Sequence, residues 1–236
     1  MNILVNGSSP ARGSGSWPYL IQQHYNANLV NLAQAGAGND YIVDATISEL
    51  TKRKYDLVII MAADLRRVDI KVSNIDRFND TIYTSKCQKA MNDWPEKQVW
   101  PVNDQDYVDD NWVFGCGYIN TKDPSIVSLF ESYYANTDAD TQYFRSYCKI
   151  LGLQGFLKSS NQPYLMCGTR HFTRLKRFES LYAALDFNYI VNDISIFEIA
   201  KNIDSWESDG LHPGQQAHKL YSNHLIDQLT NRKILS

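Results

Sequence analysis

The sequence predicts a doubly wound α/β domain, with a parallel sheet between two layers of helices. The segments Ile3–Val5 and Tyr55–Met61 are rich in apolar residues and have the length of buried strands. Glycines follow the first two predicted strands, at Gly7, Gly36 and Gly38. A segment with the apolar spacing of a helix separates the second strand from the third. An order of strand, helix, strand, helix and strand is typical of a parallel sheet with right-handed crossovers.

The bulk composition fits one domain that spans residues 1–236. A chain of 236 residues is long enough to bury a sizeable core. Its hydrophobic content of 44% and charged content of 21% are those of an ordinary globular protein. The formal net charge is −3 and the sequence has no basic stripe, which argues against a nucleic-acid partner.

The cysteines and the N-terminal residues bear on the cellular compartment in which the chain is made. Four cysteines, at positions 87, 116, 148 and 167, are widely spaced without a CxxC pair, so we expect reduced, mostly buried thiols. The start MNILVNGSS has neither the basic nor the apolar region of a signal peptide, and no run approaches the roughly 18 apolar residues of a membrane span. We therefore expect cytoplasmic synthesis without a membrane partner. Later release, or delivery on a larger particle, stays open.

The N-terminal elements follow from hydrophobic spacing and capping signals. Pro18 is compatible with the first turn of a helix. Val43, Ile47 and Leu50 repeat at helical spacing, and Asn39 precedes them as a predicted N-cap. The predicted elements are a strand at 3–5, a helix at 16–25, a strand at 28–33, a helix at 40–53 and a strand at 55–61.

The middle of the chain is less regular than either end. Residues 66–120 are polar and aromatic, hold three tryptophans and show no sustained helical period, so we expect a long insertion or cap beside the strand ends. These tryptophans suit either a core or a stacking platform for sugar rings. Further elements are expected as helices at 124–134 and 141–158, a strand at 162–168, a segment at 169–187 that is helical in its second half, and a strand at 189–191.

Two C-terminal predictions concern helix faces. Pro213 starts the last helix. The expected buried face of this helix consists of Ala217, Leu220, Tyr221, His224 and Leu225. The expected buried face of the helix at 141–158 consists of Phe144, Tyr147, Cys148 and Leu151.

The chemistry of the chain centres on Ser9, Asp209 and His212. Ser9 lies at the carboxyl end of the first predicted strand, the edge at which open parallel sheets bind ligands. In the turn DGLHPG, Asp209 precedes His212 by three residues, close enough to fix the tautomer of the imidazole. A loop before the last helix reaches the same edge, so a serine and its general base can meet there. Each motif could instead have a purely structural role, with Ser9 capping a helix and DGLHPG forming an ordinary turn.

These blocks resemble the SGNH/GDSL hydrolase superfamily of serine esterases and lipases. Gly7-Ser8-Ser9 stands where the family has Gly-Asp-Ser, Gly36 matches the glycine of the second block, and Asp209 and His212 match the terminal Asp-x-x-His. The resemblance covers about residues 1–67 and 204–229. It implies a flavodoxin-like three-layer α/β/α sandwich with a mainly parallel five-stranded sheet. It also implies Ser9 as nucleophile and the N–H groups of Ser9 and Gly36 as oxyanion-hole donors, without a metal or organic cofactor.

The third block departs from the family pattern. The family's Gly-x-Asn-Asp falls on Met61 to Asp64, so Ala63 stands in place of an asparagine that would donate a third hydrogen bond to the oxyanion. Loss of one such donor typically costs about 10²–10³ in rate. Substitute donors or substrate-binding residues are expected among Asn39, Arg66 and Arg67. The stretch SWPYL at 16–20 and the altered third block resemble SGNH-like proteins encoded by tailed phages.

Two functions follow from these observations. The first is a serine esterase that hydrolyses short acyl esters, with O-acetyl groups on polysaccharide favoured by the resemblance. The second is a weak or inactive structural or glycan-binding module of the same fold, as in a phage particle. For either function, the expected partners are an acyl ester or O-acetylated glycan, with assembly into a larger particle or a homo-oligomer left open. The glycine-rich loop after the first strand lacks the Gly-Lys-Ser/Thr ending of a nucleotide-binding P-loop. The histidines show no metal-ligand spacing with carboxylates.

Overall fold

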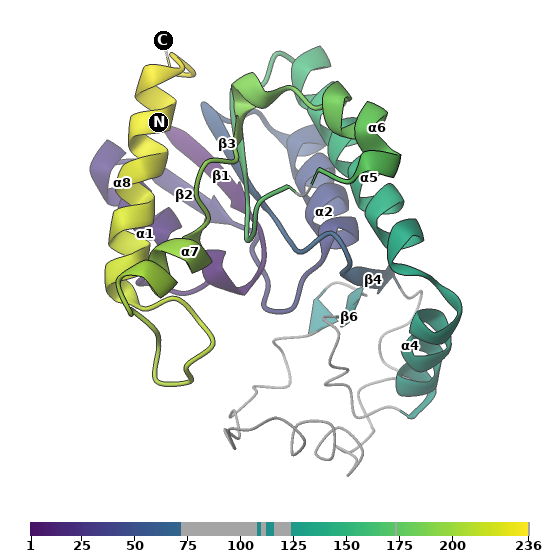
Figure 1. Cartoon of the computed structure of the whole chain (residues 1–236). Coiled ribbons are helices and arrows are strands. Elements are labelled where there is room, and N and C mark those ends of the chain that lie inside the picture. The colour runs from purple at the N-terminus through teal and green to yellow at the C-terminus, as the bar shows by residue number, and fades with distance from the viewer. Residues whose placement is uncertain (72–107, 110–111, 116–123, 173, 236) are drawn as a thin grey trace.

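A computed structural model describes residues 1–71, 108–109, 112–115, 124–172 and 174–235 of the chain. Its centre is a five-stranded sheet in the order β2-β1-β3-β7-β8, in which every neighbouring pair is parallel (Figure 1). The strands are β1 (Asn2–Asn6), β2 (Asn28–Asn31), β3 (Leu57–Ala62), β7 (Tyr164–Gly168) and β8 (Ile190–Val191). The predicted α/β fold with its parallel sheet is confirmed.

Helices cover both faces of this sheet (Figure 1). One layer consists of α1 (Trp17–Tyr25), α7 (Ile196–Asn202) and α8 (Gln215–Asn231). The other consists of α2 (Asn39–Lys52), α5 (Ala139–Ser159) and α6 (Glu179–Ala184). In the described part of the chain, the remaining helices are α4 (Pro124–Asn136) and the 3₁₀ turns η1 (Ser9–Ala11), η4 (Lys176–Phe178) and η5 (Phe187–Tyr189). Within the described ranges, no helix is long and apolar enough to cross a membrane.

The central position of β3 in the sheet explains why its residues are all apolar and do not alternate with polar ones. Val58 and Ile60 pack into the core beneath α2 and α5, while Ile59 and Met61 pack into the core beneath α1 and α8. A central strand with a helical layer on each face buries both sets of side chains. The carboxyl end of β3 therefore lies at the middle of the sheet, between the ends of β1 and β7.

The segment expected to be an irregular insertion contains a second, smaller sheet. Strands β4 (Val68–Lys71), β6 (Trp112–Gly115) and β5 (Val108–Asp109) pair antiparallel in the order β4-β6-β5. Strand β4 contacts α2. The rest of the expected insertion, at 72–107, 110–111 and 116–123, lies outside the described residues, and so do Trp94 and Trp100.

The predicted buried faces of two helices are wrong in part. In α5, Tyr147 is buried but Phe144 is 49% exposed and Cys148 is exposed. In α8, Leu220 is 41% exposed and His224 is half-buried beside Asp193. A helix buries the stripe that meets its neighbours, and the sheet and adjacent helices select a stripe about one residue away from the predicted one. The observed α5 stripe is Tyr147, Ile150, Leu153 and Leu157.

The cysteines also differ from the expectation of mostly buried thiols. Cys167 on β7 is fully buried, and this burial raises the pKa of its thiol to about 12. Cys148 is exposed and free. Cys87 and Cys116 lie outside the described residues.

Candidate active site

The loop after β1 presents Ser9 at the carboxyl edge of the sheet. Gly7 begins this loop where the backbone passes close to β3, since a Cβ at Gly7 would lie 2.9 Å from the Cβ of Met61. The chain then turns tightly, with the N–H of Ala11 donating to the carbonyl of Ser8 at 2.9 Å and that of Arg12 to the carbonyl of Ser9 at 3.0 Å. This turn leaves Ser9 only partly buried, although Ser8 and Ala11 are buried.

Asp209 builds the turn that holds His212. Its Oδ1 accepts hydrogen bonds from the backbone N–H groups of Leu211 at 2.6 Å and His212 at 2.8 Å. Gly210, which follows Asp209, has a φ of 68°, in the left-handed region that favours glycine. The second carboxylate oxygen lies 2.9 Å from Nδ1 of His212. One carboxylate therefore shapes the turn and orients the imidazole.

Ser9 and His212 meet although they are 203 residues apart. The distance between Ser9 Oγ and His212 Nε2 is 3.0 Å. Because an ionised Asp209 can only accept, the ring proton belongs on Nδ1, and Nε2 keeps a lone pair for the hydroxyl proton of Ser9. A serine, a neutral imidazole and a carboxylate in this order can generate a nucleophilic alkoxide during attack.

The loop between β2 and α2 brings Gly36 to the same edge. The N–H of Gln34 donates to the carbonyl of Gly7 at 3.1 Å, which joins this loop to the loop that carries Ser9. Gly36 has a φ of 78°, a backbone conformation that favours glycine. Neither the N–H of Gly36 nor that of Ser9 donates a hydrogen bond to any residue that the structure describes. Both groups can donate to a bound oxyanion.

Asn39 has a different role from the predicted one. Gly38 is the N-cap of α2 and Asn39 is its first helical residue, so the predicted cap is wrong. The buried Asn39 side chain instead binds the backbone at Ala63. Its Oδ1 accepts from the N–H of Ala63 at 3.0 Å, and its Nδ2 donates to the carbonyl of Ala63 at 3.3 Å. Asn39 therefore ties the start of α2 to the third block.

The two arginines expected near the site also have partners within the fold. Arg66 forms a bidentate ion pair with Asp64, with N–O distances of 3.1 Å and 3.0 Å. Arg67 donates from Nη1 to the carbonyl of Ala37 at 3.3 Å. Their role in substrate binding stays a prediction.

Asp69 is a residue near this site to which the sequence pattern had assigned no role. It lies on β4, is 5% exposed, and each of its carboxylate oxygens lies 2.9 Å from the N–H of Gly38. The N–H of Tyr41 donates to it at 3.0 Å, so Asp69 caps the N-terminus of α2 from outside that helix. The small sheet therefore supports the segment that follows Gly36. The sequence signal that points to a role for Asp69 is its position as a carboxylate between the apolar residues Val68 and Ile70.

Asp69 makes stability depend on pH with a definite sign. Burial raises the pKa of Asp69 from 3.8 to about 7, although the N–H groups of Tyr41 and Gly38 oppose this rise. Between these values the folded protein keeps a proton that the unfolded chain releases, so this contribution to the unfolding free energy falls as pH rises. A tenfold difference in proton affinity between the folded and unfolded states is worth about 1.4 kcal/mol.

We expect Asp69→Asn to remove this dependence. Urea unfolding of both proteins between about pH 4 and pH 8 should show the wild type losing stability relative to the variant as pH rises through this window. A stability difference that is constant with pH would contradict the assignment.

His218 on α8 is a second residue without a role in the sequence-based prediction. Its Nδ1 accepts the N–H of Trp17 at 3.3 Å, which joins α8 to the start of α1. Burial, together with the nearby His212, lowers the pKa of His218 to about 4, so the ring is neutral at physiological pH. His218 therefore acts as a hydrogen-bond acceptor for the N–H of Trp17.

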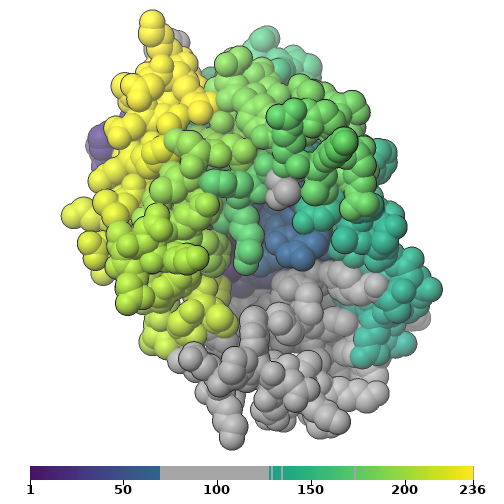
Figure 2. All heavy atoms as spheres, viewed as in Figure 1, coloured from purple at the N-terminus to yellow at the C-terminus, as the bar shows by residue number. Residues whose placement is uncertain are grey.

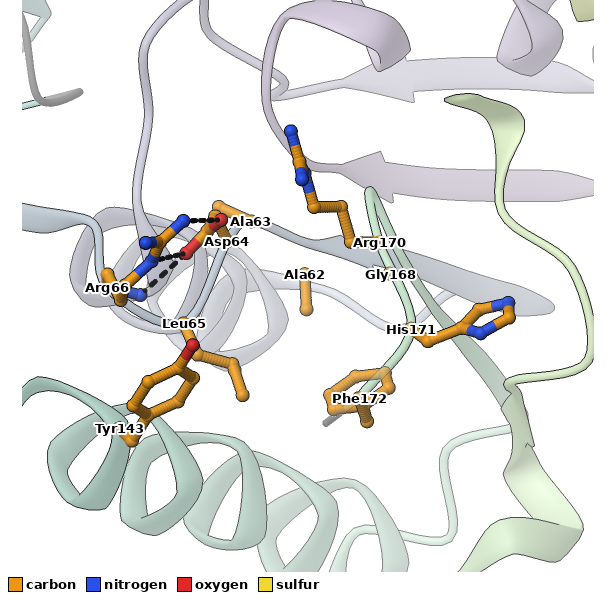
Figure 3. Close-up of a pocket in the computed structure, with 10 residues that line it drawn as sticks. All are labelled: Ala62, Ala63, Asp64, Leu65, Arg66, Tyr143, Gly168, Arg170, His171 and Phe172. Atoms are coloured by element: carbon orange, nitrogen blue, oxygen red, sulfur yellow. Dashed lines mark hydrogen bonds and ion pairs between the residues drawn. The ribbon is translucent and has the colours of Figure 1, made fainter. Parts of the chain in front are cut away.

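Two cavities adjoin the carboxyl edge. The first has a volume of about 180 Å³ and lies at the ends of β3 and β7, where it is lined by residues from Ala62 to Arg66, Tyr143, Gly168 and residues from Arg170 to Phe172 (Figure 3). In Figure 2 the surface is hollowed where blue atoms of the β3–β4 region lie between the green and teal segments. The second cavity, of about 550 Å³, is lined by residues of 12–16, 205–208 and 214–218. Within the described part of the chain, no group of three His, Cys, Asp or Glu side chains is placed to hold a metal ion.

Comparison by sequence finds no relative. No protein-family model matches the chain. No curated protein matches it either.

Comparison by structure finds matches over almost the whole chain. The psychrotrophic esterase EstA from Pseudoalteromonas sp. is 12% identical, with 98% of this chain and 97% of EstA covered and a TM-score of 0.50. TesA is also 12% identical, with 98% and 99% covered and a TM-score of 0.52. A lipolytic protein assigned to the G-D-S-L family, from Desulfitobacterium hafniense, is 12% identical with 97% and 99% covered and a TM-score of 0.46. This chain therefore has the fold of EstA and TesA, in agreement with the α/β sandwich that its sequence blocks predict.

Proposed function

We propose that this protein is a serine esterase with Ser9 as nucleophile, His212 as general base and Asp209 as the residue that orients the imidazole. One observation carries the proposal, namely the 3.0 Å contact of Ser9 Oγ with an imidazole whose other nitrogen lies 2.9 Å from a carboxylate. A serine and a histidine from opposite ends of the chain do not need this arrangement for folding. It is the arrangement that activates a serine for acyl transfer.

The reaction follows from the positions of these groups. Ser9 Oγ attacks the ester carbonyl carbon while His212 Nε2 takes the hydroxyl proton, and the imidazolium is stabilised by Asp209. The N–H groups of Ser9 and Gly36 donate to the oxyanion. The C–O bond to the alcohol then breaks and His212 returns the proton to the departing oxygen, which leaves an acyl-enzyme. Water, deprotonated by His212, hydrolyses the acyl-enzyme and restores Ser9.

Short acyl groups are the proposed substrates, with acetyl esters of polysaccharide favoured by the family resemblance. The cavity of about 180 Å³ beside Ala63 supports a small acyl or sugar substituent rather than a long chain. Esterase activity is also what the name of EstA, which shares this fold, describes for that protein.

Hydrolysis of p-nitrophenyl acetate tests the proposal, followed by release of acetate from an acetylated xylan. We expect wild-type protein to release nitrophenol, and a reactive phosphonate ester to add covalently to Ser9, as detected by mass spectrometry of the peptide that contains it. The absence of both hydrolysis and a Ser9 adduct would refute the proposal.

A non-catalytic module of the same fold is the second candidate, favoured by Ala63. The missing asparagine removes one oxyanion donor, and the N–H of Ala63 is already bound to Asn39. In that case the loops that carry Ser9 and His212 would serve to bind a glycan or a protein rather than to cut an ester.

Restoring the missing donor should separate these candidates. We expect Ala63→Asn to raise kcat for p-nitrophenyl acetate by up to about 10²-fold, because one oxyanion donor is typically worth 10²–10³ in rate. The cavity next to Ala63 offers room for the amide. Ala63→Val is the matched control, since it adds bulk without a donor. Equal activity of the two variants would contradict a vacant donor position.

A further inference from the structure

We propose that the cavity at the ends of β3 and β7 binds a carboxylate of the substrate, and that Arg170 is the residue that recognises it. This inference rests on the proposed esterase function and narrows its substrates to esters of a carboxylate-bearing alcohol, such as an acidic sugar. Arg170 was not among the residues that the sequence predicted for the site.

The charges that line the cavity leave one cation without a partner among the described residues. Arg66 is neutralised by the bidentate ion pair with Asp64. His171 lies 2.7 Å from a carboxylate oxygen of Glu198. Arg170, in contrast, forms no ion pair and no hydrogen bond through its side chain with any described residue. The described lining therefore carries one uncompensated positive charge, which suits a ligand group with a single negative charge.

The sheet places this cation within reach of an ester bound at Ser9. Strand β3 lies between β1 and β7, so the ends of β1 and β7 are two strand spacings apart, about 10 Å. Between them β3 ends at Ala62, and the small side chains of Ala62 and the next residue, Ala63, line the cavity. The turn after β7 is tight, since a Cβ at Gly168 would overlap the carbonyl oxygen of Arg170.

The side chains around the cavity fit a small organic acid. Arg170 extends to the opposite side of the cavity from Tyr143 and Phe172 (Figure 3). A guanidinium presents a planar set of donors that matches a carboxylate bidentately. The lining is polar at Arg170 and aromatic at Tyr143 and Phe172. A volume of about 180 Å³ holds a carboxylate with part of the ring that carries it.

A pair of esters that differ only in charge tests the proposal. In 4-acetoxybenzoate a carboxylate lies across one ring from the ester, and 4-acetoxybenzamide is its neutral counterpart. We expect Arg170→Gln to lower kcat/KM for the benzoate by about 10- to 100-fold, the usual value of a charge-assisted bidentate contact. The value for the benzamide should change less than about twofold. Arg174→Gln is the matched control, because Arg174 carries the same charge nearby but pairs with Glu179 on the surface.

Other outcomes would overturn the proposal. An equal loss of kcat for both esters would assign Arg170 to the oxyanion instead of to a substrate carboxylate. No loss for either ester would remove Arg170 from the site. Calorimetry of 4-hydroxybenzoate binding, to the Ser9→Ala variant and to the double variant Ser9→Ala/Arg170→Gln, measures the affinity of the anion site in the absence of catalysis. If neither ester is hydrolysed but the binding of 4-hydroxybenzoate depends on Arg170, the esterase proposal fails and the anion-site proposal is supported. If this binding does not depend on Arg170, the anion-site proposal is refuted.

Discussion

Replacing Ser9 by alanine is expected to lower kcat for p-nitrophenyl acetate by up to about 10⁶-fold, the order of the loss when a serine hydrolase loses its nucleophile. The reason is that Ser9 Oγ is the only atom of the protein that bonds to the acyl group in the proposed reaction. The 3.0 Å contact with His212 is lost in the same change, so the base has no hydroxyl to deprotonate. Residual activity should come from oxyanion donors and bound water.

The matched control for this variant is Ser8→Ala. Ser8 is the neighbouring serine, is fully buried, and its hydroxyl has no hydrogen-bond partner among the described residues. Removing that hydroxyl leaves no polar partner behind, so folding and kcat should both stay close to the wild type. If Ser9→Ala keeps more than about a tenth of the wild-type kcat while Ser8→Ala behaves alike, Ser9 is not the nucleophile.

Replacing Asp209 by asparagine is expected to lower kcat by about 10³- to 10⁴-fold, through the tautomer of His212. An asparagine oxygen can still accept the backbone N–H groups of Leu211 and His212, so the turn should survive. The amide NH₂ then faces Nδ1 of His212 and donates to it, which places the ring proton on Nε2. In that tautomer Nε2 cannot accept the proton of Ser9.

A second Asp–His pair on the same protein provides the control. Asp193 lies 3.1 Å from Nε2 of His224, away from Ser9 and largely exposed. Asp193→Asn makes the same chemical change, and we expect kcat within about twofold of the wild type. The measurement is kcat for p-nitrophenyl acetate, with urea unfolding as a check on the fold. A normal kcat for Asp209→Asn would limit Asp209 to its role in the turn.

The sheet could be predicted because its determinants are local. An apolar run that lacks alternation, as in β3, is explained only by burial on both faces, and each predicted strand of the main sheet has its counterpart in the structure. The turn from Asp209 to His212 is likewise local, since three residues and one glycine suffice to bring the carboxylate to the ring. Helix faces were predicted less well, because the spacing in α5 allows adjacent stripes and only the neighbours choose between them.

By itself, then, the sequence determined the parallel α/β sheet, the position of Ser9 after its first strand and the Asp209–His212 turn. Tertiary structure decided how Asn39 binds the backbone of Ala63, how Asp69 caps α2 from another strand, and how Arg170 comes to line a cavity with Ala63. These contacts join segments that are distant along the chain. The spacing of residues along the chain does not predict these contacts. Their energies depend on strand order and packing, which arise only when the whole chain has folded.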